Sequence, residues 1–257
     1  MQSILATAQV ALSLLLLIAA GLFLRSLQNT LAINPGFEVK NRLAVGLNLS
    51  YAQYTEGDGR LFYQRLLERM RHLRGVERAS LAVFLPLSYA KQTASVSVDG
   101  YVAGKNESML VENNSVGEDY FETMGIPILQ GRAIDVRDRE ETEPVVVVNE
   151  SMARRFWGSR NAVDRAVTIG GSRHRVIGVA RDSRNFQLDE QPAAFFYRPL
   201  SQLYAPFTSL IVKSVGDPRQ LLPTVVGGIE ALDPNLPLSD AKTLPEHMRL
   251  SQYPATI

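Results

Sequence analysis

The chain has 257 residues, of which 46% are hydrophobic and 21% charged, enough to build a core in one or two domains. It carries 27 Lys and Arg against 26 Asp and Glu, and this net charge of +1 disfavours nucleic acid as a partner, because phosphate binding favours basic proteins. The chain has no cysteine, which excludes disulfide bonds, thiolate nucleophiles and iron–sulfur ligation within it.

The N-terminal region is apolar. No charged residue occurs from Ile4 to Leu24, a stretch about as long as the ~30 Å hydrocarbon layer requires of a helix. We predict a transmembrane helix over residues 4–27. The alternatives are a cleaved signal peptide and a buried core helix. The first three residues lack the basic charge of a signal peptide, and a core helix that is apolar all round would need a much larger protein to cover it. Arg25 alone would place the following domain in the cytoplasm, yet a folded domain of this size crosses the membrane largely regardless of its charge.

A turn and a strand are expected next. Residues 28–41 form the predicted linker, in which Pro35 and Gly36 make a turn. Apolar residues alternate with other residues from 42 to 49, and this period of two predicts a half-buried strand.

Helical spacing replaces the alternation after Asp58. Apolar residues recur on one face up to Gly75, which we expect to be the left-handed C-cap, and basic side chains crowd the last turn, where they suit the negative end of the helix dipole. The run from 75 to 87 then predicts a second strand, ended by Pro86.

The rest of the chain is rich in short strands. The segments 95–100 and 109–116 are predicted to form a hairpin, and a last helix is expected from Asp217 to Leu232. Further strands are predicted over 145–148, 166–171, 174–180 and 208–215.

This order of elements predicts an α+β fold with an inserted subdomain. Residues 42–112 together with 206–250 are expected to form a membrane-proximal α+β lobe. Residues 113–205 are expected to form a β-rich insert that projects distally.

The sequence contains no pattern typical of a catalytic or metal-binding site. His72, His174 and His247 are far apart in sequence, and none has a second ligand at helical spacing, so no metal site is predicted. No phosphate loop, nucleophile elbow or dinucleotide fingerprint occurs, so we predict no cofactor and no enzymatic activity.

Other chemically suggestive segments have structural explanations. The glycines of "IGGSRHR" indicate a turn. The carboxylates Asp189 and Glu190, like those at 140, 141 and 143, are expected in solvated loops. The aromatic run at 195–197 can be a stacking platform, but we favour an edge strand packed on the insert.

Five segments in order carry a resemblance to a known family. They are "AQVALSLLLLIAAGLFLRSL", "INPGF", "EDYFETMGIPILQGR", "VVVVNESMARRFWG" and "HRVIGVARDSRN". Together they resemble the MacB/FtsX-like permeases of ABC transporters, particularly the duplicated-permease branch, and the match covers nearly the whole chain. The chain departs from the family at residues 161–165, where the family usually has a Pro-Gly-Lys or Pro-Gly-Arg turn.

The resemblance implies a membrane helix followed by an exterior, MacB-like core domain in the bacterial inner membrane. It implies a fragment of a longer permease, a separate cytoplasmic ABC ATPase as motor and a second permease copy as partner. In some relatives such domains dock a periplasmic adaptor, in others a murein hydrolase, and the lipoprotein-sorting relatives handle a lipid-modified cargo. The expected partners are thus the lipid bilayer, the ATPase, the second copy and a periplasmic protein.

The function expected from these observations is that of a noncatalytic relay and docking module for transport or efflux. Candidate partner contacts are Arg137, Arg139 and Arg184, which fall in the insert. The alternative is a membrane-tethered periplasmic sensor, in which a pocket between the lobes holds a small molecule and no ATPase is involved.

Overall fold

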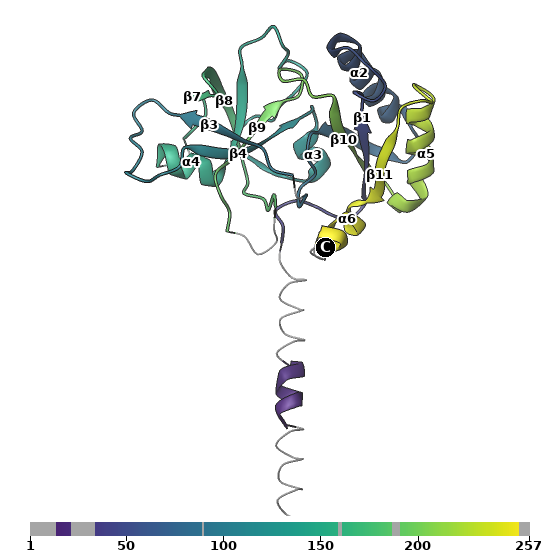
Figure 1. Cartoon of the computed structure of the whole chain (residues 1–257), viewed down its shortest axis with the longest axis horizontal. Coiled ribbons are helices and arrows are strands. Elements are labelled where there is room, and N and C mark those ends of the chain that lie inside the picture. The colour runs from purple at the N-terminus through teal and green to yellow at the C-terminus, as the bar shows by residue number, and fades with distance from the viewer. Residues whose placement is uncertain (1–13, 22–33, 89, 159–160, 187–190, 252–257) are drawn as a thin grey trace, which may run out of the picture.

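A computed structural model describes residues 14–21, 34–88, 90–158, 161–186 and 191–251. Residues 14–21 are helical, and among the described residues no helix has the length and apolar character needed to cross a membrane. Most of the predicted membrane helix 4–27 and residues 28–33 of the predicted linker 28–41 lie outside the described residues. The remaining described residues form two lobes that lie side by side (Figure 1).

The four-stranded lobe is built from the first and the last strands of the two-lobed part of the chain. Its strands lie in the order β11-β1-β10-β2, and all its neighbouring strands are antiparallel. A helix follows the first and the third of its strands, so the chain makes two split β-α-β units, the ferredoxin-like arrangement. Its elements are β1 (Arg42–Asn48), α2 (Glu56–His72), β2 (Val76–Ala82), β10 (Phe207–Ser214), α5 (Pro218–Glu230) and β11 (Leu238–Thr243).

The barrel lobe is inserted between β2 and β10. Its strands pair in the closed cycle β4-β3-β7-β8-β6-β9 and back to β4, so each strand of this ring has two neighbours within it. Strand β5 pairs with residues 178–180 of β8, beyond the part that pairs with β7, and β4 also meets β2. The elements of this lobe are β3 (Thr93–Ser97), β4 (Leu110–Val116), β5 (Ile128–Gly131), β6 (Val145–Asn149), α4 (Glu150–Trp157), β7 (Ala166–Ile169), β8 (Ser172–Ala180) and β9 (Phe195–Pro199).

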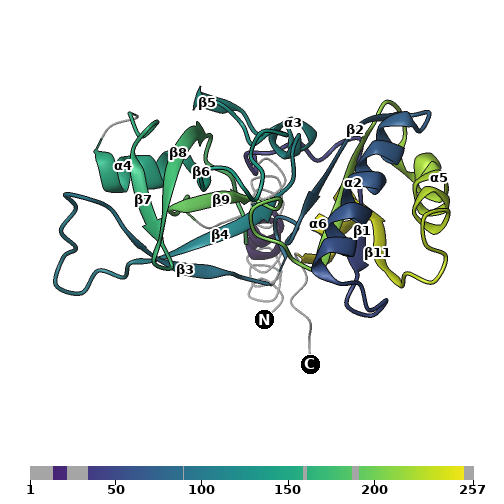
Figure 2. The same ribbon diagram turned by 90° about the horizontal axis from the view of Figure 1, so that it is seen from above.

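Two short helices complete the fold near the boundary of the lobes. Helix α3 (Tyr120–Met124) contacts β2 and β10, and α6 (Leu244–Ser251) follows β11 directly. Seen from above, α2 and α5 cover the outer side of the four-stranded sheet, while the barrel lies beyond its other side (Figure 2).

Local chemistry explains where the helices begin and end. Helix α2 starts after Thr55, whose hydroxyl accepts from the Asp58 amide at 3.2 Å, and Asp217 caps α5 in the same way ahead of a proline in the first turn. The predicted C-cap of α2 at Gly75 is wrong. The cap is Leu73, in an extended conformation, and the φ of +93° at Gly75 serves the turn into β2.

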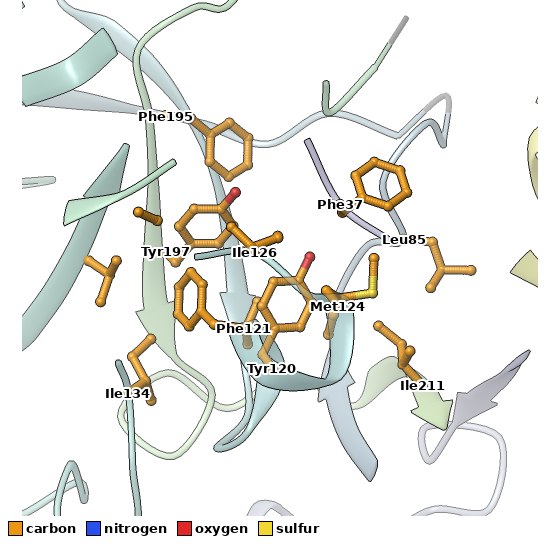
Figure 3. Packing of buried hydrophobic residues seen from close by; sticks show 14 of the residues in the cluster. Phe37, Leu85, Tyr120, Phe121, Met124, Ile126, Ile134, Phe195, Tyr197 and Ile211 are labelled. Atoms are coloured by element: carbon orange, nitrogen blue, oxygen red, sulfur yellow. The ribbon is translucent and has the colours of Figure 1, made fainter. Parts of the chain in front are cut away.

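Three hydrophobic clusters hold the structure together. One lies between the four-stranded sheet and helices α2 and α5, and another fills the barrel. The third, which we call the central cluster, joins the lobes and is centred on α3, with aromatic rings from α3 and β9 packed edge to face (Figure 3). Its members include Phe37, Leu85, Tyr120, Phe121, Met124, Tyr197 and Ile211.

Most predicted strands are confirmed, including the hairpin of β3 and β4 and the turn at Gly170 and Gly171, both at positive φ. Strand β1 is not half-buried as predicted. Leu43 faces the helices and Ala44 faces the central cluster, so both sides are covered. The aromatic run forms β9, which packs as predicted but pairs on both sides and is not an edge strand.

The α+β class is confirmed, whereas the predicted division into a proximal and a distal lobe stays a prediction. The predicted boundary at residue 112 falls inside β4. Strands β3 and β4 pair with strands of the barrel, so both belong to the inserted lobe. Helix α4 and strands β5 and β11 had no counterpart in the sequence-based prediction.

Candidate functional site

The segment of residues 34–41, which we call the junction segment, is packed between the two lobes. Phe37 is only 5% exposed and belongs to the central cluster. The Glu38 amide donates to the Met124 carbonyl at 2.8 Å on one side, and the Arg184 amide donates to the Pro35 carbonyl at 2.7 Å on the other. The junction segment therefore contacts α3 and the loop after β8 at the same time.

A buried arginine fastens the end of the junction segment. Arg42, 1% exposed, donates from Nε to the Thr123 carbonyl at 2.6 Å, from Nη1 to the Lys40 carbonyl at 2.7 Å and from Nη2 to the Glu38 carboxylate at 2.6 Å. A buried guanidinium is tolerated only when its N–H groups find acceptors, and these acceptors lie in fixed places. Arg42 thus joins β1, α3 and the junction segment into one unit.

Close packing at Gly36 adds to this attachment. With φ at +82°, Gly36 lies against the loop after β8, where a Cβ would come within 2.4 Å of the Asp182 carbonyl oxygen and 2.7 Å of the Ser183 Cα. Glycine is required here both for the backbone conformation and for the space. The junction segment therefore cannot shift along this loop without a collision.

The last described helix attaches to the same region. Leu244 at the start of α6 is fully buried in the central cluster, and the Glu246 carboxylate accepts from the Thr243 amide at 3.0 Å, which stabilises the first turn. His247 Nε2 lies 2.9 Å from the Pro86 carbonyl oxygen, so the neutral ring donates there. Burial lowers the pKa of His247 and favours that neutral form. The junction segment and α6 thus meet at the central cluster.

The three predicted partner contacts do not lie together. Arg137 and Arg139 are exposed in the connection between β5 and β6, where Arg137 pairs with Asp135 at 2.6 Å and Arg139 Nε donates to the Val136 carbonyl at 3.0 Å. Arg184 is half-buried beside the junction segment, and its Nη1 is buried without a hydrogen-bond partner among the described residues. Their role in partner binding stays a prediction.

A cleft of about 730 Å³ separates α2 from the connection between β5 and β6, and we call it the interlobe cleft. Two arginines of α2 reach across it. Arg60 Nη2 lies 3.3 Å from the Glu140 carboxylate, and Arg71 pairs with Glu118 and, at 3.5 Å, with Asp119. Because eleven residues are about three helical turns, Arg60 and Arg71 share one face of α2.

Helical spacing in the sequence puts Arg60 and Arg71 on the polar face of α2 but gives no sign of their contacts with the insert. Spacing along one helix carries the information that two side chains share a face. It does not show which distant segment that face meets. No local signal could have identified Glu118 or Glu140 as the partners.

The residues examined as catalytic or metal-binding candidates stay apart. His72 is exposed, His174 is half-buried and His247 is buried, each in a different element. Within the described ranges no three His, Cys, Asp or Glu side chains are grouped so as to hold a metal ion. Glu141 and Glu143 are exposed, as expected, while Asp189 and Glu190 lie outside the described residues.

The fold and the junction define a class of protein: a two-lobed α+β domain whose N-terminal segment and last described helix converge on one core between the lobes. Residues 3–226 match the model of the family described as MacB-like periplasmic core domain. The chain therefore belongs to this family, and the expected family resemblance is confirmed.

Curated relatives agree with this assignment. The chain is 28% identical to the macrolide export ATP-binding/permease protein MacB of Aggregatibacter actinomycetemcomitans over 153 residues, which are 59% of this chain and 22% of that protein. It is 26% identical to the protein of the same name from Mannheimia succiniciproducens over 207 residues, 79% of this chain and 30% of that protein. The chain thus spans less than a third of the length of these relatives.

A solved structure shares the fold. The crystal structure of the periplasmic region of MacB from Actinobacillus actinomycetemcomitans superposes with a TM-score of 0.57 at 15% identity. The match covers 88% of this chain and 100% of that one. At this identity the likeness shows the fold.

Proposed function

We propose that this chain is the extracytoplasmic domain, with the first membrane helix, of an ABC transporter permease, and that it relays conformational changes driven by a cytoplasmic ATPase. Family membership and relatives named as ATP-binding/permease proteins support the transporter assignment. The chain has no nucleotide-binding motif of its own, so the motor is a separate domain or subunit. The two lobes lie outside the inner membrane.

The packed junction segment is the observation that carries the relay. A flexible linker would allow a membrane helix to move without moving the domain. Here Phe37 is buried, Gly36 is pressed against the loop after β8 and Arg42 has three hydrogen bonds. A displacement that enters through this segment therefore reaches both lobes together, because packed interiors resist deformation.

The relay is tested by loosening the junction segment in the full-length permease. Residues 34–40 are replaced by a Gly/Ser sequence of equal length, and transport in cells is measured alongside the folding of the domain. We expect transport to be lost while both lobes still fold. The matched control replaces residues 102–106, an exposed part of the connection between β3 and β4, in the same way. Normal transport with the loosened junction would reject the relay.

The location of the lobes has its own test. Alkaline phosphatase fused after Ser251 should be active, whereas a fluorescent protein that matures only in the cytoplasm should be dark in the same position. The opposite pattern would place the lobes inside the cell and would remove the docking role as well.

Docking of a periplasmic adaptor, or of another periplasmic protein, is proposed for the barrel lobe. Arg137 and Arg139 are the positions to reverse, because both are exposed and neither belongs to a hydrophobic cluster. Arg184 is a poor choice, since its side chain is half-buried beside the junction segment, and a carboxylate placed there would disturb that packing and mimic a damaged relay. Loss of transport in Arg137→Glu/Arg139→Glu with unchanged folding would support docking. Unchanged transport would leave this connection without a docking role.

A sensor that works without an ATPase is the second candidate, and the interlobe cleft is the feature that favours it. The parent gene separates the two. Three further membrane helices after residue 257, or a neighbouring gene for an ATP-binding cassette, would exclude the sensor.

A further inference from the structure

Three polar side chains point into the barrel from β4, β8 and β9. His174 lies directly opposite Val167 across the β7–β8 pair. Asn113 lies opposite Phe196 on β9, and Arg198 follows that phenylalanine by two residues. Val167 and Phe196 belong to the cluster that fills the barrel. Residues opposite one another, or two apart on one strand, share a face of the sheet, so the three polar side chains face the inside as well.

His174 and Arg198 lie at the same end of the barrel, the end away from α4. Strand β6 runs parallel to β8, so its first residues lie beside the part of β8 that holds His174. It runs antiparallel to β9, so the same residues lie beside the last part of β9, which holds Arg198. Helix α4 begins directly after the other end of β6. Both side chains are half-buried, so this end of the barrel keeps some contact with water.

The Arg198 guanidinium has no countercharge among the described residues. Its single hydrogen bond within this part of the chain runs from Nη2 to the Asn113 Oδ1 at 3.0 Å, and its Nε is buried without a partner. The centre of the Phe196 ring lies 5.6 Å from the guanidinium carbon. Burial lowers the pKa of Arg198, and no carboxylate of the described residues counters that effect. A half-buried arginine in such surroundings favours an oxyanion, which would match both its charge and its planar donors.

His174 offers a second donor beside Arg198. Its Nδ1 lies 2.8 Å from the Ser172 carbonyl oxygen and therefore carries a proton that it donates there. Nε2 is then the atom that gains a proton when the ring becomes charged. Burial lowers the pKa of His174, the hydrogen bond to Ser172 opposes this, and the charge of Arg198 lowers the pKa further. The ring is therefore neutral near pH 7, and an anion between it and Arg198 would favour its protonation.

Acidic side chains are absent from the inner face at this end. The six strands of the ring contain one acidic residue, Glu112 on β4, and it lies opposite Phe195, which belongs to the central cluster outside the barrel. Arg173 and Arg175 alternate with His174 along β8, face outward and form ion pairs with acidic residues of other segments. The ring strands thus supply two basic side chains to this inner face and no carboxylate.

We propose that the end of the barrel away from α4 binds the carboxylate of a small organic acid, which accepts hydrogen bonds from Arg198 and from the protonated ring of His174. Binding takes up one proton when the ring is neutral beforehand. Affinity for the acid therefore rises as the pH falls toward the pKa of the free ring. This site and the relay can fail independently, because neither residue belongs to the junction segment or to the central cluster.

Nuclear magnetic resonance of the histidine Cε1 carbons reads the site directly, because the chain has three histidines. The full chain, labelled with ¹³C at this carbon, is held in lipid nanodiscs and its pH is varied with and without sodium acetate at constant ionic strength. We expect acetate to raise the pKa of His174 and to leave those of His72 and His247 unchanged. By linkage, the Kd for acetate should fall about tenfold once His174 is protonated.

Sodium sulfate, titrated in parallel at about pH 7.5, tests the class of anion. Arg198 is the charged member of the site at that pH, because the His174 ring is neutral. A singly charged carboxylate is then matched by one cation, whereas a doubly charged ion is not. Sulfate should therefore change the His174 signal less than acetate does.

Two substitutions assign the effect to Arg198. Arg198→Gln removes the charge but keeps an amide donor for Asn113. It should raise the pKa of His174 in the absence of acetate, since a repelling charge is lost, and should abolish the response to acetate. The matched control Arg173→Gln removes a cation from the adjacent, outward-facing position and should respond like the unaltered chain. Arg198→Lys keeps the charge without the planar fork and should bind acetate more weakly.

The same spectra report folding, because the pKa of His247 is lowered only while its surroundings bury it. A response of His174 that disappears in Arg198→Gln and persists in Arg173→Gln supports the site. The site is disproved if acetate has no saturable effect, if it acts equally on all variants or if sulfate binds more tightly. Should Arg198→Gln fail to fold, Arg198→Lys decides: weaker binding of acetate supports the site, and binding as tight as in the unaltered chain overturns it.

Discussion

The two lobes bury their apolar residues in different ways. The barrel lobe closes a ring of strands around its own cluster, and its strands all come from residues 93–199. The four-stranded lobe is an open sheet whose strands come from 42–82 and 207–243, and each of its faces needs a separate cover. One cover is made by α2 and α5. The other is the central cluster, to which the junction segment contributes Phe37.

This difference indicates which lobe depends more on the junction segment. The barrel keeps a cluster of its own inside the ring, and only its outer side, mainly at β6, β8 and β9, contributes to the central cluster. An open sheet must be covered, and the junction segment and α3 provide part of the cover. The four-stranded lobe should therefore respond more strongly than the barrel when the junction is altered.

Loss of the Phe121 ring from the central cluster should lower the stability of the domain most. Phe121→Ala removes a ring that is 1% exposed and lies 5.0 Å from the ring centre of Tyr197 on β9, so we expect a loss of about 3–5 kcal/mol in the free energy of unfolding. Urea denaturation measures it. Phe207→Ala is the control, because that ring is 45% exposed and its loss should cost less than about 1 kcal/mol. Equal costs would mean that the central cluster is not the main joint between the lobes.

Removal of the buried Arg42 guanidinium should have the second-largest effect on stability. Arg42→Met leaves the buried carbonyl of Thr123 without its donor, and a buried acceptor left unsatisfied costs about 1–3 kcal/mol, whereas the Lys40 carbonyl can be hydrated. Glu38 is 64% exposed at its side chain and can be hydrated instead. Arg78→Met, at an exposed position of β2, is the matched control and should be nearly neutral. If the two variants denature alike, Arg42 does not fasten the junction.

His247 should make the domain less stable in mildly acid solution, and this effect is smaller than the two before it. Burial lowers the pKa of His247 in the folded chain, so the unfolded chain binds more protons once the pH falls through the ordinary histidine value near 6.5. The stability contributed by the neutral ring is therefore complete above that pH and declines below it, until the folded-state pKa is passed. His247→Gln should show a shallower decline than the unaltered chain in thermal unfolding between pH 7 and 5.5. An identical decline would show that His247 is not responsible.

The ion pair across the interlobe cleft should matter least. Side chains of Arg60 and Glu140 are 20% and 57% exposed, so a double-mutant cycle with Arg60→Met and Glu140→Gln should give a coupling below about 1 kcal/mol. The coupling should shrink further at high salt. A salt-independent coupling of several kcal/mol would mean that the lobes are locked across the cleft rather than at the central cluster.

Several elements could be predicted because their signals are local. The apolar spacing of α2, the Asp-Pro start of α5 and the paired glycines between β7 and β8 each depend on residues a few positions apart. Strand β11 escaped prediction, since its sequence of mostly polar residues has no apolar alternation. Helix α4 escaped for a different reason: it follows β6 without a break, and its apolar face is only two turns long.

The site was less accessible to sequence reasoning than the fold class. The arginines singled out in the insert, Arg137, Arg139 and Arg184, were chosen as charged residues in loops, and the structure places them in two separate regions. Arg42 was not singled out, because in sequence it is one more basic residue at the start of a strand. Its importance comes from burial, which depends on α3 and the junction segment arriving from elsewhere in the chain.

The α+β class, most strand positions, the two long helices α2 and α5 and the membership of a permease family follow from the sequence, because periodicity, capping residues and ordered motifs are properties of neighbouring residues. Only the tertiary structure decided that β3 and β4 close a ring with β9, that both sides of β1 are buried and that Arg42 lies inside. The interlobe cleft likewise exists only where α2 meets a connection about 70 residues further along the chain. Such contacts are non-local, and which of many apolar faces pair is settled by the packing of the whole domain.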